Sequence, residues 1–134
     1  MREVLAAATS GLQAASRRIE VSARNVVNAD SVGTPASTTD ARQPTEAYKP
    51  QRVVQTPVAG GGVETQTVTA DPPTRTEFRP DHPAAGSDGQ VEVPNVDRVR
   101  EAVEQIAARA AYEASAKVVQ TADGLLKTIL DIRS

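Results

Sequence analysis

Apolar residues recur at both ends of the chain with the spacing of α-helices. In residues 1–28 they follow one another at intervals of three and four, the rhythm of a helical seam. These positions are Leu5, Ala8, Leu12, Ala15, Ile19, Ser22 and Val26. A second stripe of helical period runs through residues 95–134, at Val103, Ala107, Ala110, Ala114, Val118, Thr121, Leu125, Ile129 and Ile132. At about 1.5 Å per residue, the helices would be roughly 40 and 55 Å long, and each stripe needs a partner.

The expected helix ends are marked by particular residues. Pro94 precedes Asn95, whose side chain can cap the first turn of the second helix. Asp97 would place a negative charge near the positive end of that helix dipole. The first helix is expected to end at Asn28, because asparagine readily takes the left-handed conformation found at helix C-termini.

The middle of the chain has a different composition, since residues 29–94 contain all nine prolines. Residues 48–58 and 63–69 are rich in β-branched side chains, and the segment between them is Ala-Gly-Gly-Gly. This pattern predicts a β-hairpin. Residues 31–46 and 70–92 are dominated by Thr, Ser, Pro, Asp and Gly, so we expect extended segments there and no packed elements.

The predicted fold class is therefore mainly α with a small β part. Residues 1–30 and 95–134 form two long helices in an antiparallel coiled pair, and residues 31–94 form an extended and β-hairpin segment between them. With the helices side by side, the two chain ends come together. The middle segment then forms the far end of an elongated molecule.

Composition limits both the core and the class of partner. The 134 residues include only three aromatic side chains, at Tyr48, Phe78 and Tyr112, so apolar area must be buried by Ala, Val, Leu and Ile on closely spaced helices. The net charge of −2 gives no attraction to nucleic acid or an anionic membrane. No apolar signal-peptide core or membrane span is recognisable, so we expect neither a cleaved signal peptide nor a spanning helix.

Candidate chemistry is sparse. The chain has no cysteine, and its one histidine, His82, has no second His or Cys with which to bind zinc. The three glycines 60–62 are followed by Val63 and Glu64, which excludes a phosphate-binding P-loop. Asp71, Asp81 and Asp88 do not have the spacing of a calcium loop. We therefore expect no catalytic residue, no cofactor and no metal, and the protein is predicted not to be an enzyme.

A motif near the N-terminus carries more information. Ser-Gly-Leu at residues 10–12 is followed by Asn-Val-Val-Asn-Ala-Asp-Ser at residues 25–31. An ordinary helix ending at Asn28 would explain the second segment without any function. The pair nevertheless resembles the N-terminal signature of the flagellar rod and hook axial proteins, which is SGL followed by N-[LIV]-A-N-A-[DN]-[ST]. Val27 stands where that family has alanine.

The C-terminal third resembles the same family in the same order. Residues 93–97 read Val-Pro-Asn-Val-Asp, residues 109–114 read Arg-Ala-Ala-Tyr-Glu-Ala, and Thr-Ala-Asp at 121–123 precedes Leu-Leu-Lys-Thr-Ile-Leu. These are similar to the family's PNV, S-R-A-Y-E-A-N and T-A-D-x-L-L-K-T patterns, with Ala108 and Ser115 replacing the usual Ser and Asn.

The middle of the chain is similar to the small proximal-rod members of this family. The similar features are Tyr-Lys-Pro-Gln-Arg-Val-Val at residues 48–54, the Gly-Gly-Val turn at 61–63, and His82-Pro83 leading to Asp88-Gly89. Distal rod and hook members are longer and carry an extra domain.

The resemblance implies a structural subunit of the proximal rod of the bacterial flagellar basal body, which polymerises into the drive shaft that transmits torque from motor to hook. It implies contacts with copies of itself, with neighbouring rod proteins, with the base of the rod at the inner-membrane ring and with the flagellar type III export apparatus, and a periplasmic location reached without a cleaved signal. Residues expected in assembly contacts are Leu5, Leu12, Ile19, Asn25, Val26, Asn28, Pro94, Asn95, Val96, Val103, Arg109, Tyr112, Glu113, Val118, Thr121, Leu125 and Ile129.

One alternative from a different class remains open. The chain could be a soluble helical adaptor that presents its proline-rich hairpin to a protein partner. A stable monomer would favour the adaptor. A rod subunit would be only partly folded on its own, because its helices would be ordered by neighbouring subunits.

Overall fold

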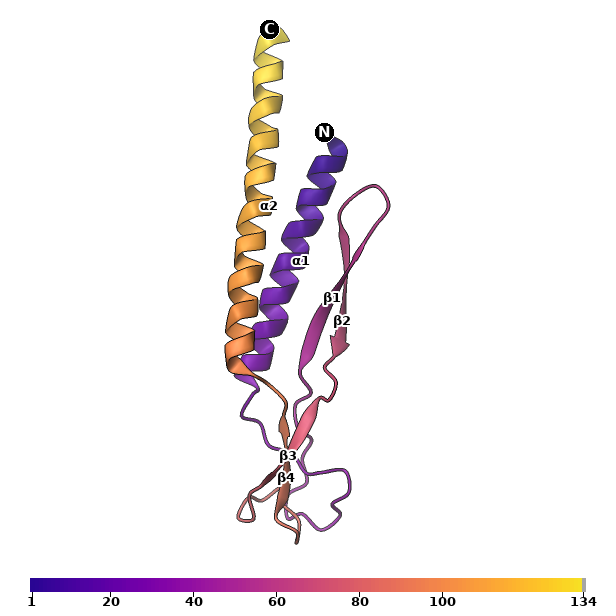
Figure 1. Ribbon diagram of the computed structural model, residues 1–134, viewed down its shortest axis with the longest axis vertical. Helices are drawn as coiled ribbons and strands as arrows, with labels where there is room; N and C mark the ends of the chain where they lie inside the picture. Colours follow the sequence, from indigo (N-terminus) through magenta and orange to yellow (C-terminus); the bar gives the residue numbers. More distant parts are fainter. Residues whose placement is uncertain (134) are drawn as a thin grey trace.

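The protein is an elongated molecule with a long helix at each end of the chain and short strands between them (Figure 1). The computed structural model describes residues 1–133, and Ser134 lies outside this range. The elements follow in the order α1 (Arg2–Val27), β1 (Gln51–Pro57), β2 (Val63–Thr69), β3 (Thr74–Phe78), β4 (Gln90–Pro94) and α2 (Arg98–Arg133). This arrangement confirms the predicted fold class.

Helices α1 and α2 pack against each other as an antiparallel pair through small side chains. On α1, the predicted seam positions Ala8, Ala15 and Ser22 are buried, while the larger seam residues are partly buried. On α2, Ala108 and Ala122 are buried. The helices approach so closely that a Cβ atom on Gly11 would lie 2.7 Å from Ser115 Oγ. The buried part of the contact between the helices is therefore made by small side chains.

The stripe predicted along α2 is present, but its residues are exposed and do not make the closest contact with α1. Val103, a member of that stripe, is 60% exposed, whereas Ala108 is fully buried. Alanine occurs on every side of α2, so the period of its apolar residues could not show which side packs on α1. The small residues make this contact, because they allow the closest approach of the two helices.

Strands β1 and β2 form the predicted hairpin, with Gln51 opposite Thr69 and Pro57 opposite Val63. All three glycines of the connecting loop have positive φ angles, between 90° and 97°, which other residues rarely adopt. The hairpin does not form the far end of the molecule. It folds back alongside α1, where Val63 N donates a 3.1 Å hydrogen bond to Ser10 Oγ (Figure 1).

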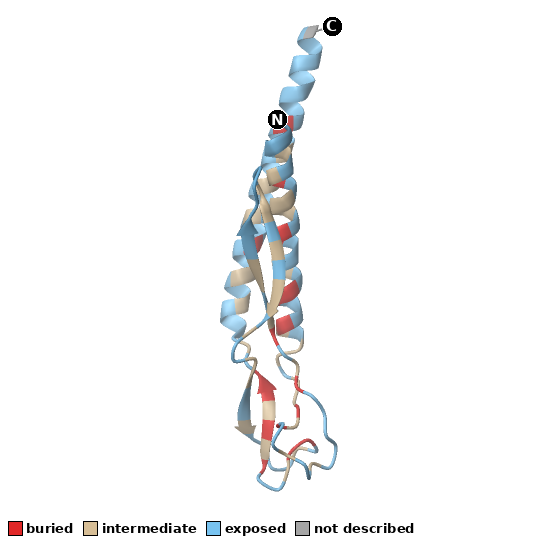
Figure 2. Cartoon of the chain, turned by 90° about the vertical axis from the view of Figure 1, so that its right-hand side faces the viewer, coloured by how far each residue is buried: buried red, intermediate tan, exposed pale blue. Residues whose placement is uncertain are grey.

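Strands β3 and β4 form a second antiparallel pair at the far end of the molecule, where only extended segments were expected. The expectation was wrong for residues 70–92, because alternate residues of β4 enter a small core. Val91 and Val93 are buried there with Ala85, and Val32 packs against them (Figure 2). Pairing across an eleven-residue Pro- and Gly-containing connection, residues 79–89, leaves little local signal in the sequence.

The helix ends also differ from the expectation. Asp97 caps α2, because its Oδ1 accepts hydrogen bonds of 2.9 Å from Val99 N and 3.2 Å from Arg100 N. The Asn95 side chain instead donates to Pro72 O. At the end of α1, Asn28 has φ −97° and is not left-handed. Its side chain donates to Arg24 O, so it satisfies a terminal carbonyl without the left-handed turn.

Candidate assembly surface

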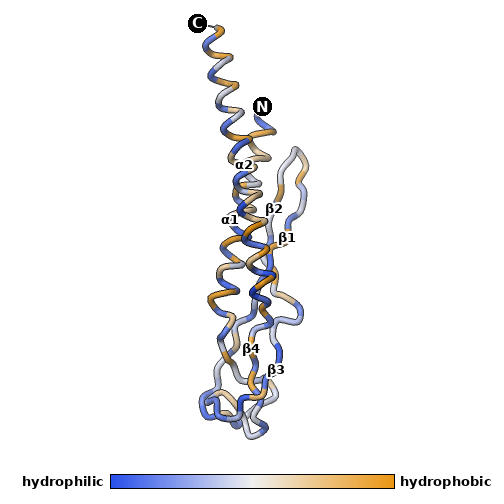
Figure 3. The backbone as a smooth tube through the Cα atoms, turned by 60° about the vertical axis from the view of Figure 1, so that its left-hand side comes forward, coloured by the Kyte–Doolittle hydropathy of each residue, from blue (hydrophilic) through white to orange (hydrophobic). Residues whose placement is uncertain are grey.

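The outer side of α2 carries a row of exposed apolar residues. Val99, Val103 and Ile106 are 75%, 60% and 71% exposed, and Ala110 continues the row. At about 100° per residue these positions share one side of the helix, roughly opposite Ala108. Apolar positions recur along α2 in the hydropathy colouring of Figure 3. Contiguous exposed apolar surface of this kind is typical of a protein interface. We name Val99, Val103, Ile106 and Ala110 the outer face of α2.

An apolar cleft lies near the other end of the helical pair, between the start of α1 and the second half of α2. It has a volume of about 410 Å³ and is lined by Met1, Val4, Lys117, Val118, Thr121, Ala122 and Leu125. Three residues predicted as assembly contacts are thus brought together here: Val118, Thr121 and Leu125. About one turn further along α2, Ile129 is 51% exposed.

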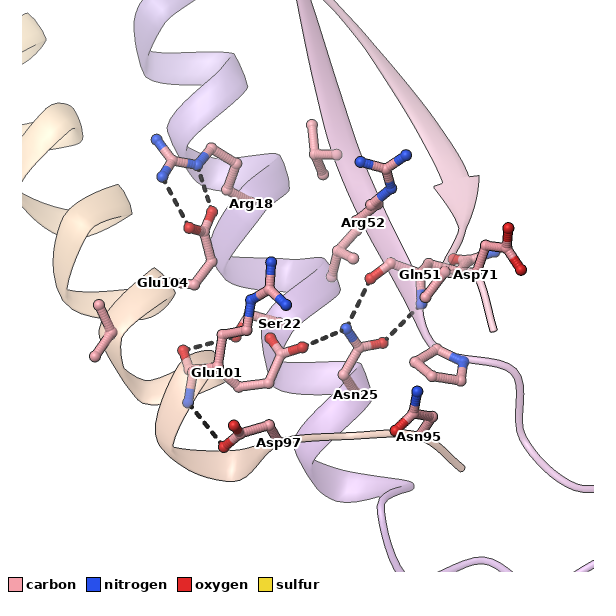
Figure 4. A pocket seen from close by; sticks show the side chains of 16 residues that line it. Arg18, Ser22, Asn25, Gln51, Arg52, Asp71, Asn95, Asp97, Glu101 and Glu104 are labelled. Carbon is pink, nitrogen blue, oxygen red and sulfur yellow. Dashed lines mark hydrogen bonds and ion pairs between the residues drawn. The ribbon is translucent and has the colours of Figure 1, made fainter. Parts of the chain in front are cut away.

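Asn25, the first asparagine of the N-terminal motif, joins three elements at the base of the helical pair (Figure 4). Its Nδ2 donates to Gln51 O at 2.7 Å and to Glu101 Oε1 at 2.9 Å. Its Oδ1 accepts hydrogen bonds from Gln51 N and from the Tyr48 hydroxyl, each at 3.0 Å. The side chain is 2% exposed and both of its polar atoms are satisfied. Asn25 therefore fixes α1, β1 and α2 to one another.

More polar contacts between the helices surround Asn25. Ser22 Oγ donates to Glu101 O and accepts from Gln105 Nε2. Arg18 donates two hydrogen bonds to the Glu104 carboxylate, at 2.5 and 3.0 Å. These bonds raise the pKa of the Arg18 guanidinium, and burial raises the pKa of the Tyr48 hydroxyl.

A polar cavity of about 750 Å³ opens beside these contacts (Figure 4). Its walls carry cationic and anionic side chains together, Arg18, Arg52, Arg100, Asp71, Asp97, Glu101 and Glu104, so it favours neither an anion nor a cation. The predicted residues Asn25, Asn95 and Val103 also line it.

The rest of the N-terminal motif secures the exit from α1. Asp30 pairs with Arg98 at the start of α2, and Ser31 Oγ accepts a hydrogen bond from Tyr48 N. Val27, where the family pattern has alanine, is 81% exposed and lies outside the helical seam of this chain. Most motif residues are thus explained by contacts within the subunit.

The remaining predicted residues fall into two groups. Leu5, Leu12, Ile19, Val26 and Val96 are partly buried and Pro94 is fully buried, so they serve the packing of the subunit itself. Tyr112 is 42% exposed, and Arg109 pairs with Glu113 at 3.0 Å on the helix surface. The exposed group remains available to another molecule.

Several residues of the outer face of α2 and of the contacts around Asn25 were not predicted from the sequence. Val99 and Ile106 precede and follow Val103 at intervals of four and three, a signal that the predicted stripe did not include. Tyr48, Glu101 and Glu104 gave no such signal, because their partners come from distant segments. Only the fold brings them together.

Within residues 1–133, no three His, Asp or Glu side chains gather as metal ligands. Neither of the two helices is apolar enough over a sufficient length to cross a membrane. Every buried side-chain polar atom in the described part of the chain has a hydrogen-bond partner.

Comparison with known proteins gives a consistent result. Residues 87–132 match the family model described as the C-terminal part of the flagellar basal body rod FlgEFG proteins. Over 129 residues the chain is 40% identical to the flagellar basal-body rod protein FlgC of Yersinia enterocolitica and 37% identical to that of Salmonella typhimurium, covering 91% of this chain and 90% of each relative. The FlgC protein of Borreliella burgdorferi is 28% identical over 148 residues.

Proposed function

The chain belongs to the FlgC family of flagellar basal-body rod proteins and is a structural subunit of the proximal rod, and we propose that it polymerises there through the outer face of α2. The observation that carries this proposal is the exposure of Val99, Val103 and Ile106 in a row. The row lies on a helix that already packs on α1 through Ala108 and Ala122. Burial against another subunit would gain about 25 cal/mol for each Å² of apolar surface.

The proposed partners are copies of this chain and the neighbouring axial proteins of the rod. A head-to-tail contact between unlike surfaces does not close on itself, so it generates a helical polymer. The α1 helix shows a mainly polar outer side, including Arg17, Glu20 and Arg24, so the apolar contact is assigned to α2. Residues 1–30 and 95–134 would then build the shaft, and residues 31–94 would surround it.

The proposed mechanism is the transmission of torque by many packed contacts, without catalysis. A rotating shaft needs subunits that do not slip, and the polar contacts around Asn25 hold the two helices and the hairpin in fixed relation. We further propose that the chain reaches the periplasm through the flagellar type III export apparatus without a cleaved signal peptide, and that it also contacts the base of the rod at the inner-membrane ring.

Purified basal bodies provide the test. The subunit is expected as stoichiometric protein in the rod, with density between the inner-membrane ring and the distal rod. Its absence from basal bodies of cells that express it would contradict the proposal. A stable, fully helical monomer that is absent from basal bodies would instead favour the adaptor.

A further inference from the structure

The helical pair is fastened at one end and much less so at the other. The polar contacts between α1 and α2 begin at Arg18 and lie toward the Asn25 end, where Arg18, Ser22 and Asn25 bond to Glu101, Glu104 and Gln105. Between residues 1–17 and residues 98–129 of α2, no side-chain hydrogen bond or ion pair occurs. Polar contacts therefore hold the two helices together at the Asn25 end only.

The seam of the unfastened half is lined by small side chains. The buried residues of this half of α1 are Ala8, Ala14 and Ala15, and Gly11 faces Ser115 on α2. Side chains of this size leave no deep interlocking that would specify one angle between the helices. A small change in the angle between the helices therefore breaks few strong contacts between α1 and α2.

The two helices also diverge in this half. Figure 1 shows α1 moving away from α2 toward its N-terminus. The apolar cleft between Val4 on one helix and Val118, Thr121 and Leu125 on the other lies in the opening. The cleft has apolar walls that a closer approach of the helices would bury, so a closed arrangement is favoured by burial and opposed by no polar contact.

We propose that the two helices form a jaw, hinged at the Asn25 contacts, whose N-terminal half opens and closes about the cleft. The hinge contacts fix one end of the pair, and the alanine seam allows the other end to change its angle. This property belongs to the chain itself and goes beyond the proposed function. In the rod, the jaw would let one subunit fit positions with unequal neighbours, and only this extension rests on the proposed function.

Spin labels on the full chain test the jaw directly, because the sequence has no cysteine of its own. One pair of labels, Ala6→Cys with Gln120→Cys, spans the open half, and a second, Ala23→Cys with Ala102→Cys, spans the hinge; all four positions are exposed. Pulsed electron-electron distance measurements are expected to give a broad distribution for the first pair and a narrow one for the second. Equal widths, whether both narrow or both broad, would overturn the proposal.

A filled cleft supplies the second arm of the test. Thr121→Leu adds apolar volume to the cleft wall and is expected to narrow and shift the distribution of the first label pair. Thr128→Leu is the matched control, since both threonines are exposed on α2 and donate to the carbonyl four residues before, and Thr128 lies outside the cleft. If both variants narrow the distribution equally, or neither does, the cleft is not the moving part. Because these measurements use the free chain, their failure would leave the proposed role in the rod untouched.

Discussion

At the scale of single residues, the N-terminal motif is explained by the bonds of its side chains. Asn25 uses the full capacity of its amide, and Asp30 and Ser31 fasten the loop that follows α1. An apolar or shorter side chain at position 25 could not replace these bonds. The first asparagine of the motif therefore connects α1, β1 and α2 within the subunit.

Replacing Asn25 should destabilise the folded chain strongly. Asn25→Ala leaves the Gln51 backbone groups and the Tyr48 hydroxyl without a partner, and each buried polar group left unsatisfied costs about 1–3 kcal/mol. We expect the free energy of unfolding, measured with urea, to fall by at least about 2 kcal/mol. Asn95→Ala is the control, because its exposed side chain makes one bond to Pro72 O. Equal losses for the two variants would contradict the role assigned to Asn25.

Tyr48 should make the stability depend on alkaline pH. Burial raises the pKa of its hydroxyl in the folded state, so its contribution is fully present below the unfolded value of about 10 and is lost as the pH rises through the folded pKa. Tyr48→Phe should therefore cost about 1 kcal/mol near neutral pH, and the difference from the original chain should shrink above about pH 10. Urea unfolding of both proteins, from neutral pH to above about pH 10, measures this difference in the free energy of unfolding. A difference that stays constant with pH would argue against a buried, bonded hydroxyl.

At the scale of elements, the sequence predicted long helices and local hairpins but not the contacts between distant segments. Both helices and the β1–β2 hairpin follow from periodicity and from a glycine loop, which are local signals. Strands β3 and β4 were missed because their pairing depends on Val91 and Val93 entering a core with residues far away in the chain. The cap at Asp97 was assigned to Asn95, since both residue types can cap a helix and only the fold separates them.

The side of α2 that packs on α1 could not be predicted from the period of its apolar residues. Its predicted stripe is exposed, and a row of small residues takes the contact with α1. The period of apolar residues favours Val and Leu over Ala as the residues of α2 that contact α1. Close packing of two helices instead favours the smaller side chain. The residues predicted for assembly were consequently divided between packing within the subunit and a free surface.

Gly11 should be essential to the close approach of the helices. Its hydrogen faces Ser115 Oγ, and a leucine there would force α1 and α2 apart. Gly11→Leu is expected to lower the free energy of unfolding by about 1–3 kcal/mol, the usual cost of overpacking. Ser16→Leu on the exposed side of α1 should change it little. Comparable losses at both positions would indicate that the seam is not tightly packed.

At the scale of the whole molecule, the chain has a long shape and few large buried side chains. Val99, Ile106 and Ile129 are exposed on α2, so much of the apolar surface of this helix is available to a partner molecule. Circular dichroism of the dilute chain is expected to show less helix than the structure contains, because the helix ends remote from the Asn25 contacts are ordered by neighbouring subunits, and helicity should rise with protein concentration. Full helicity in dilute monomer would show that the subunit needs no neighbours to order its helices.

The most direct test places a charge in the outer face of α2 and measures incorporation into the rod. Ile106→Asp buries an unpaired carboxylate if this face is an interface, yet Ile106 is 71% exposed in the free subunit, so the fold of the subunit should persist. Gln120→Asp introduces the same charge at an exposed polar position of the same helix. The predicted result is that basal bodies contain the Gln120→Asp protein and lack the Ile106→Asp protein, although both are stably produced. Equal incorporation of the two variants would contradict assembly through this face.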